Sequence, residues 1–131
     1  MQGAMFIKDR IGEWPIYPGH PLVIATEIME VFPSFAAANE PTVQGWSAAL
    51  GDQRITGAGC HVGAAMRVLK IGREGGRPED MISYANRYWD EGKAGGHVKN
   101  VEAGRLQSQA VETRFLELCQ SWFSEVGESR G

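Results

Sequence analysis

The sequence predicts an all-α protein, a small bundle of about five helices with an extended N-terminal arm and a long C-terminal helix. Three observations lead to this prediction. The chain has 131 residues, of which 43% are apolar and 22% charged, and these are values of one ordinary globular domain. Apolar residues recur at spacings of three and four, the period of one helix face. Prolines and glycines divide this pattern into separate segments.

The arm comprises residues 1–20, ahead of the first helical segment. Its prolines and glycines block a continuous helix, and residues 1–4 read like a cloning remnant before a native start at Met5. Trp14 and Tyr17 lie on this arm. We interpret them first as side chains that fasten the arm to its own bundle, and second as a contact for a protein partner.

The helical domain is expected to span residues 21–126. A first helix from Pro21 to about Phe32 is apolar around most of its circumference, so we expect it to be buried at the centre of the bundle. Pro33 should end this helix, because proline interrupts the hydrogen bonds of a helix interior. Residues 34–39 should then form a connection.

Two shorter segments follow this connection. Pro41 is expected to open a second helix in which Trp46 is a core residue. A glycine-rich stretch precedes a third helix, which begins at Val62 and ends in the glycines of residues 72–76. We therefore expect the third and fourth helices to be joined by a glycine turn.

The fourth helix has the clearest start in the sequence. Pro78 suits the first helical position, and Glu79 and Asp80 suit the positive end of the helix dipole. The apolar face consists of Met81, Ile82, Ala85, Tyr88 and Trp89. We expect this face to dock the helix and its aromatic end to contact a partner protein. The predicted contact residues are Tyr84, Tyr88 and Trp89.

The last helix should begin between Val98 and Ala103 and continue to Val126. It carries a broad apolar stripe, which must be covered by other residues. The stripe consists of Val111, Phe115, Leu116, Leu118, Cys119, Trp122, Phe123 and Val126. Closing its own bundle is the favoured interpretation, and a homodimer through this helix is the alternative. Residues 127–131 should form a flexible polar tail.

The formal net charge of −3 argues against a protein whose whole surface binds nucleic acid. Basic side chains nevertheless gather around the predicted glycine turn. They are the candidate contact to an anion or a nucleic acid, and they comprise Arg67, Lys70, Arg73, Arg77 and Arg87. A mixed, solvated surface is the simpler interpretation of the same residues. Two helices joined by a short turn loosely resemble a helix-turn-helix, but Glu79 and Asp80 would then approach the phosphates.

No catalytic or metal-binding motif stands out. His20, His61 and His97 are too far apart in sequence for short-spaced metal ligands, and the glycine-rich segments lack the lysine and serine or threonine that end a phosphate-binding loop. We therefore expect a protein that is not an enzyme and that needs no cofactor or metal. The sequence has no apolar run of about 18 residues and opens with no secretion signal, so no membrane is expected and the cytoplasm is the expected compartment.

The order of segments from Leu22 to Tyr88 is similar to that of a known family. An apolar helix ends at Phe32-Pro33-Ser34-Phe35, a helix with Trp46 and an alanine-rich helix follow, and Pro78-Glu79-Asp80-Met81-Ile82 opens the next. This order resembles the small all-helical domain of bacteriophage helicase loaders and replisome organisers. The resemblance implies a non-enzymatic adaptor in the host cytoplasm that binds the replicative helicase and helps to place it on origin DNA, or keeps it away.

The sequence departs from this family in two ways. Glycines occur at positions 57, 59, 63, 75 and 76, and the chain ends in a long aromatic helix where loaders often carry a flexible helicase-binding tail. Two other functions therefore stay open. One is a phage-encoded inhibitor that binds a host enzyme or defence complex, and the other is a small DNA-binding subunit in packaging or regulation. The expected partner is thus a protein, either a replicative helicase or another host enzyme, with nucleic acid as a second candidate.

Overall fold

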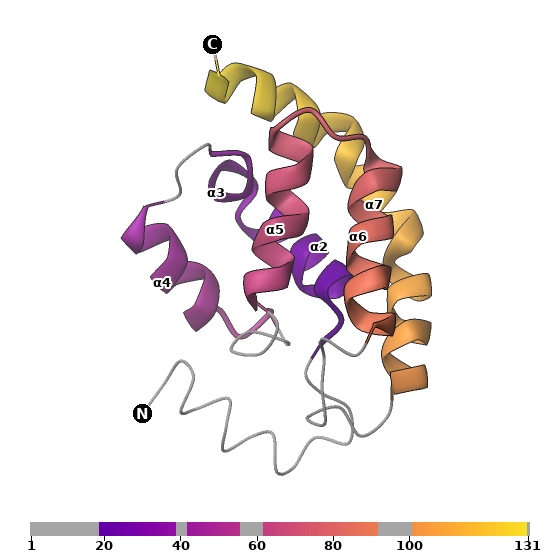
Figure 1. Ribbon diagram of the computed structural model, residues 1–131. Helices are drawn as coiled ribbons and strands as arrows, with labels where there is room; N and C mark the ends of the chain where they lie inside the picture. Colours follow the sequence, from indigo (N-terminus) through magenta and orange to yellow (C-terminus); the bar gives the residue numbers. More distant parts are fainter. Residues whose placement is uncertain (1–18, 39–41, 56–61, 92–100, 131) are drawn as a thin grey trace.

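The structure is a computed structural model that describes residues 19–38, 42–55, 62–91 and 101–130, with side chains as far as residue 127. These residues form six helices and no strand, which confirms the predicted all-α class. The helices are α2 (Pro21–Val31), α3 (Pro33–Ala37), α4 (Val43–Gly51), α5 (Val62–Arg73), α6 (Pro78–Asp90) and α7 (Val101–Arg130) (Figure 1). Of the predicted arm, only Gly19 and His20 are among the described residues.

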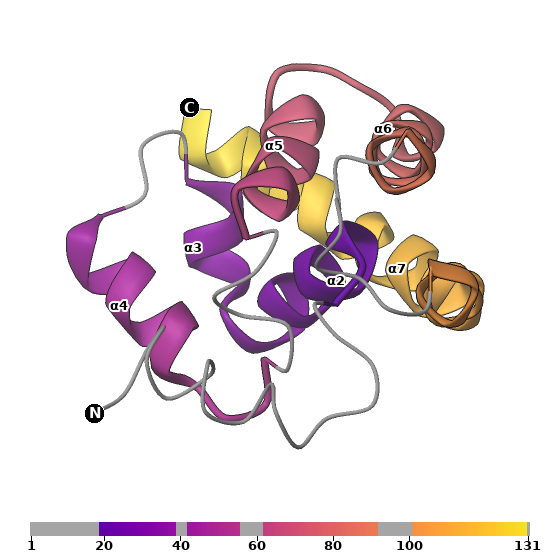
Figure 2. The same cartoon turned by 60° about the horizontal axis from the view of Figure 1, so that its bottom comes forward.

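Helix α2 is the central helix of the bundle. His20 caps its start, because the imidazole Nδ1 accepts a hydrogen bond of 3.1 Å from the backbone N–H of Leu22. The helix packs against α3, α5, α6 and α7, and Figure 2 shows it between them. Ile24, Ile28 and Met29 are buried as a result. The predicted buried central helix is confirmed, since apolar residues around a whole helix require neighbours on every side.

The connection expected at residues 34–39 is partly wrong, because α3 occupies residues 34–37. Phe32 has a φ of −131° and interrupts the helical backbone after α2. Pro33 then stands at the first position of a new helix, where its missing N–H costs nothing. Ala36 and Ala37 of α3 are buried in the core. The proline therefore marks a start as well as an end.

Helix α4 lies at the edge of the bundle, as Figures 1 and 2 both show. It starts a little later than predicted, because Thr42 is the capping residue and its hydroxyl accepts a hydrogen bond of 2.9 Å from the N–H of Gly45. Trp46, expected in the core, is only half-buried. Its ring packs edge-on against Phe35 of α3, with the ring centres 5.9 Å apart. Ala49 is the residue of α4 that reaches the core.

The predicted glycine turn joins α5 to α6. Gly75 has a φ of +106°, a conformation that glycine adopts readily because it has no Cβ. The N–H of Gly76 donates to the carbonyl of Ile71 at 2.8 Å, and that of Gly75 donates to Gly72 at 3.3 Å. This is the pattern of a Schellman motif, which satisfies the last carbonyls of a helix. The two helices therefore leave the turn in opposite directions.

Helix α6 begins at Pro78, as predicted. The carboxylate of Asp80 accepts a hydrogen bond of 2.8 Å from the backbone N–H of Arg77, so a donor at the helix start is satisfied. Met81 of α6 packs closely over Gly72 of α5, where a Cβ would lie 2.8 Å from the Met81 side chain. The glycine thus allows the two helices to approach.

Helix α7 runs antiparallel to α6, closing the bundle. Ser108 of α7 donates a hydrogen bond of 3.1 Å to the side chain of Asn86, and Arg105 pairs with Asp90 one turn away. Its apolar stripe contributes Phe115, Cys119, Trp122 and Val126 to the core. The stripe is therefore covered by its own chain, and pairing of two copies stays a prediction. The tail expected from residue 127 is helical as far as Arg130. Within the described residues, no helix is long and apolar enough to cross a membrane.

Candidate interaction surfaces

Trp89 is a core residue, so the prediction that it contacts a partner is wrong. Only 1% of its surface is exposed. The indole N–H donates a hydrogen bond of 2.8 Å to the carbonyl of Val101, and the ring centre lies 5.0 Å from that of His20. The start of α7 covers the end of α6, and Gly104 leaves room for the indole because a Cβ there would overlap it. The sequence gives no signal that these two helix ends meet.

Arg73 is also buried, which contradicts its predicted contact to an anion or nucleic acid. Its side chain turns inward from the last turn of α5, and one guanidinium nitrogen donates a hydrogen bond of 3.0 Å to the carbonyl of Ala36. Burial lowers the pKa of this guanidinium from its ordinary value. The guanidinium satisfies a carbonyl at the end of α3, so Arg73 joins α3 to α5.

The other four predicted basic residues are exposed, but two of them have acidic neighbours. Lys70 lies 4.0 Å from Glu74, and Arg77 lies 3.7 Å from Asp80. Pairs this exposed contribute little to stability, yet they reduce the charge offered to an anion. Arg67 and Arg87 form no ion pair or hydrogen bond with any side chain that the structure describes. Of the predicted row of five cations, two exposed arginines therefore have no partner among the described side chains.

Tyr84 and Tyr88 are half-buried side chains of α6 in contact with each other. Their ring centres are 6.2 Å apart, and their planes are inclined by 40°. The two residues are four apart in sequence and so share one side of the helix. Asn86, on the other side of α6, faces α7. The tyrosines consequently face the α5 side of the helix.

Helix geometry brings the two tyrosines and the two unpaired arginines to the outward side of the α5–α6 hairpin. Gly72 lies level with Met81, so Arg67, five residues before Gly72, is level with the stretch of α6 that holds Tyr84 and Tyr88. Arg87 is exposed on α6 next to Tyr88. We call Arg67, Tyr84, Arg87 and Tyr88 the tyrosine–arginine surface.

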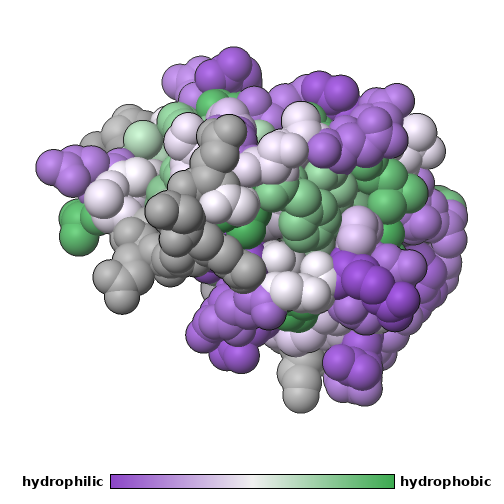
Figure 3. All heavy atoms as spheres, turned by 90° about the horizontal axis from the view of Figure 1, so that it is seen from above, coloured by the Kyte–Doolittle hydropathy of each residue, from purple (hydrophilic) through white to green (hydrophobic). Residues whose placement is uncertain are grey.

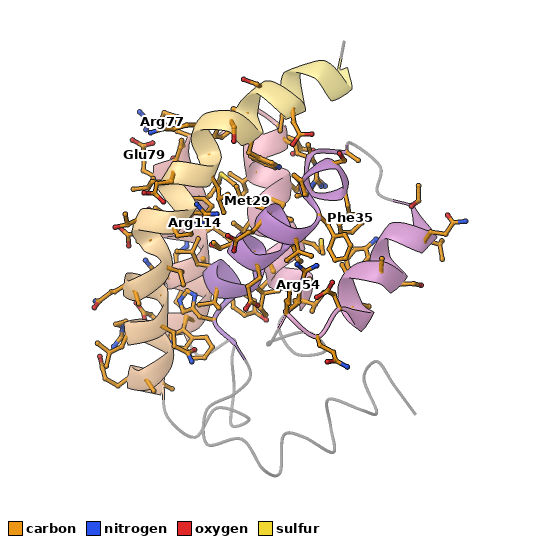
Figure 4. All side chains as sticks on the ribbon, turned by 180° about the vertical axis from the view of Figure 1, so that it is seen from behind. Met29, Phe35, Arg54, Arg77, Glu79 and Arg114 are labelled. Atoms are coloured by element: carbon orange, nitrogen blue, oxygen red, sulfur yellow. The ribbon has the colours of Figure 1, made fainter. Side chains whose placement is uncertain are left out.

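The charge around this surface is mixed. Glu74, Asp80 and Glu91 are exposed on the same hairpin, and Figure 4 shows Arg77 beside Glu79 at the start of α6. Duplex DNA is bound mainly through cations that neutralise phosphates, so acidic neighbours weaken such a contact. Tyrosine and arginine are both enriched in protein interfaces, whose rims are polar. The geometry therefore suits a protein partner better than duplex DNA.

Trp14 and Tyr17, the other two predicted contact residues, lie outside the described residues. Val43, Leu106 and Leu116 are 80%, 58% and 41% exposed, although the sequence analysis placed Leu116 on the buried stripe of α7. A helical period alone cannot define how far the covered part of a broad stripe extends, because that depends on the neighbouring helix.

The described side chains show one feature that bears on chemistry. Cys119 is a buried free cysteine in the core, and burial raises the pKa of its thiol to about 12. A thiol is a weak nucleophile until it loses its proton, so Cys119 is inert near neutral pH.

No cluster of three or more histidine, cysteine, aspartate or glutamate side chains that could hold a metal ion occurs in the part of the chain that the structure describes.

In comparisons with known proteins, no protein-family model, no curated protein and no solved structure matches this chain. The similarity to phage helicase loaders and replisome organisers therefore stays a prediction from the order of segments.

Proposed function

We propose that this protein is a non-enzymatic accessory of phage-type DNA replication, a helicase loader or replisome organiser, that binds its partner through the tyrosine–arginine surface. The order of helices supports the proposal, because an apolar helix that ends near Pro33, a helix with Trp46, an alanine-rich helix and the helix from Pro78 follow one another as in the family it resembles. A shared order of helices does not define a binding partner, so the partner must be inferred from the chemistry of the surface.

The observation that carries the proposal is that two half-buried tyrosines, whose rings contact each other, lie on the same hairpin as two exposed arginines that have no ion-pair partner among the described side chains. Tyrosine offers a large apolar area and a polar tip, and it loses little conformational entropy on binding. An arginine without an intramolecular partner can hydrogen-bond to a carboxylate of the partner without first breaking an ion pair. Together these residues resemble the energetic centre of a protein interface.

The experiment is capture of partners from a host-cell lysate on the immobilised protein after nuclease treatment, with identification by mass spectrometry. Recovery of a replicative helicase supports the proposal. Recovery of a different host enzyme favours the inhibitor, and loss of every partner after nuclease favours a nucleic-acid contact.

Variants connect the captured partner to the surface. Arg67→Ala with Arg87→Ala should weaken the purified complex by about 2 kcal/mol, or roughly thirtyfold in Kd, if both arginines are central. Arg54→Ala is the matched control, because Arg54 is 73% exposed and lies beside α4, away from this surface (Figure 4). Equal affinity of all three proteins for the partner would place the interface elsewhere.

A further inference from the structure

The opposite side of α6 forms a second surface with α7. Asn86 and Ser108 are hydrogen-bonded across the two antiparallel helices. Ile82 lies one helical turn before Asn86 in α6, and Glu112 lies one turn after Ser108 in α7, so these two residues are level with each other. The next turn brings Glu79 level with Leu116 by the same count. Figures 1 and 2 both show α6 and α7 side by side over this length.

This surface combines apolar and acidic side chains. Leu116 is 41% exposed, and Ile82 and Phe123 are half-buried. Phe123 lies seven residues after Leu116, so the two share one side of α7. Figure 3 shows the end of the bundle where α7 finishes, and there hydrophobic side chains lie among hydrophilic ones. We call Glu79, Ile82, Glu112, Leu116 and Phe123 the acidic–apolar face.

The two carboxylates of this face are unneutralised among the described residues. Neither Glu79 nor Glu112 forms an ion pair or hydrogen bond with a described side chain. Arg77 lies beside Glu79 in Figure 4 but pairs with Asp80, and Arg105 pairs with Asp90 and Glu102. A surface with apolar side chains beside two carboxylates that have no partner among the described side chains is complementary to a helix that is apolar on one side and basic along its edges.

We propose that the acidic–apolar face binds a basic amphipathic helix of a partner protein. A second copy of this chain is a poorer occupant, because a twofold interface through this face would bring the Glu79 and Glu112 carboxylates of both copies into one interface without a cation of the face to pair with them. A basic helix instead places lysine or arginine against both carboxylates while its apolar side covers Leu116 and Phe123. The proposal does not depend on the replication function or on the tyrosine–arginine surface.

The probe is a synthetic amphipathic peptide of leucine and lysine, about 18 residues or five helical turns long, with a leucine and glutamate peptide as its counterpart. Binding is measured by fluorescence anisotropy, and the surface is mapped by NMR chemical shifts of the 15N-labelled protein. We expect the lysine peptide to bind and the glutamate peptide not to bind. We expect the shifted resonances to lie on α6 and α7.

Two matched pairs of variants test the face. Leu116→Ser should weaken the lysine peptide at least tenfold, whereas Leu106→Ser should change its affinity by less than about twofold, because Leu106 lies on the outer side of α7 and is 58% exposed. Glu79→Lys with Glu112→Lys should abolish binding, whereas Glu91→Lys with Glu117→Lys, which makes the same change of charge elsewhere, should preserve most of it. Circular dichroism shows that each variant is folded.

Three results would overturn the proposal. If both variants of either pair lost the same affinity for the lysine peptide, the peptide would be bound by unspecific attraction to an acidic protein. Chemical shifts confined to other helices would place the peptide elsewhere. A dimer in sedimentation that is lost in Leu116→Ser would make a second copy the occupant. Arg67→Ala with Arg87→Ala should leave peptide binding unchanged, so failure here and failure of the proposed function are separate outcomes.

Discussion

At the residue scale, Trp89 shows how closely the ends of α6 and α7 fit. Its ring lies against His20 and over Gly104, and its N–H bonds to Val101. We expect Gly104→Ala to destabilise the protein by about 1–3 kcal/mol, because the new methyl group overlaps the indole. That cost exceeds the helix-propensity gain of roughly 1 kcal/mol. The measurement is the free energy of unfolding in urea. Gly127→Ala in the same helix is the control, since a Cβ there meets nothing within 4 Å and should be neutral or stabilising.

Cys119 gives a prediction about pH. Burial raises its pKa to about 12 from an ordinary value of 9.0, so the folded protein holds this proton more tightly than the unfolded chain. The contribution to stability is complete below pH 9 and declines as the pH rises from 9 toward 12. We expect Cys119→Ala to unfold with a weaker dependence on pH in that interval. In native protein at pH 8, iodoacetamide should leave Cys119 unmodified in peptide mapping, and rapid modification would contradict its burial.

At the element scale, the α5–α6 hairpin depends on the backbone of one glycine. Gly75→Ala forces an alanine to a φ of +106° and should cost about 1–3 kcal/mol of folding stability. Gly51→Ala is the comparison, since a Cβ at Gly51 has open space and its backbone is not at positive φ. Thermal unfolding measures both. If the two variants lost equal stability, the left-handed turn would not be what holds the hairpin.

The elements also show what the sequence could and could not predict. Local signals located α2, the glycine turn and the start of α6, because capping, proline and glycine act within a few residues. The short α3 was missed because a proline reads equally as an end and a start. Trp89 was placed on the surface and Leu116 in the core, although burial is reversed. The burial of Trp89 and the exposure of Leu116 depend on where α7 crosses α6. This crossing is a contact between residues that are far apart in sequence, so periodicity cannot predict it.

At the scale of the whole molecule, the described cations are mostly engaged. One is buried, and several form ion pairs, either within one segment or between two helices of the bundle. The arginine of the pair between α7 and α2 is labelled in Figure 4. These pairs are Arg54 with Asp52, Arg105 with Asp90 and Glu102, and Arg114 with Glu30 and Glu117. Among the residues that the structure describes, the exposed cations that form a group therefore lie on the α5–α6 hairpin.

This distribution predicts how any contact with duplex DNA responds to salt. Each neutralised phosphate contributes about −0.9 to the slope of log K against log salt, so four exposed cations give a slope no steeper than about −4. Removing Arg67 and Arg87 should reduce the slope by about 2. Arg73→Ala should leave the slope unchanged while lowering stability by roughly 1–3 kcal/mol, because it leaves a buried carbonyl without its donor. Fluorescence anisotropy of a labelled duplex between about 50 and 200 mM salt measures these slopes. A slope steeper than about −6 would require phosphate contacts by cations outside the hairpin. Such a slope would contradict the assignment of the nucleic-acid contact to this surface.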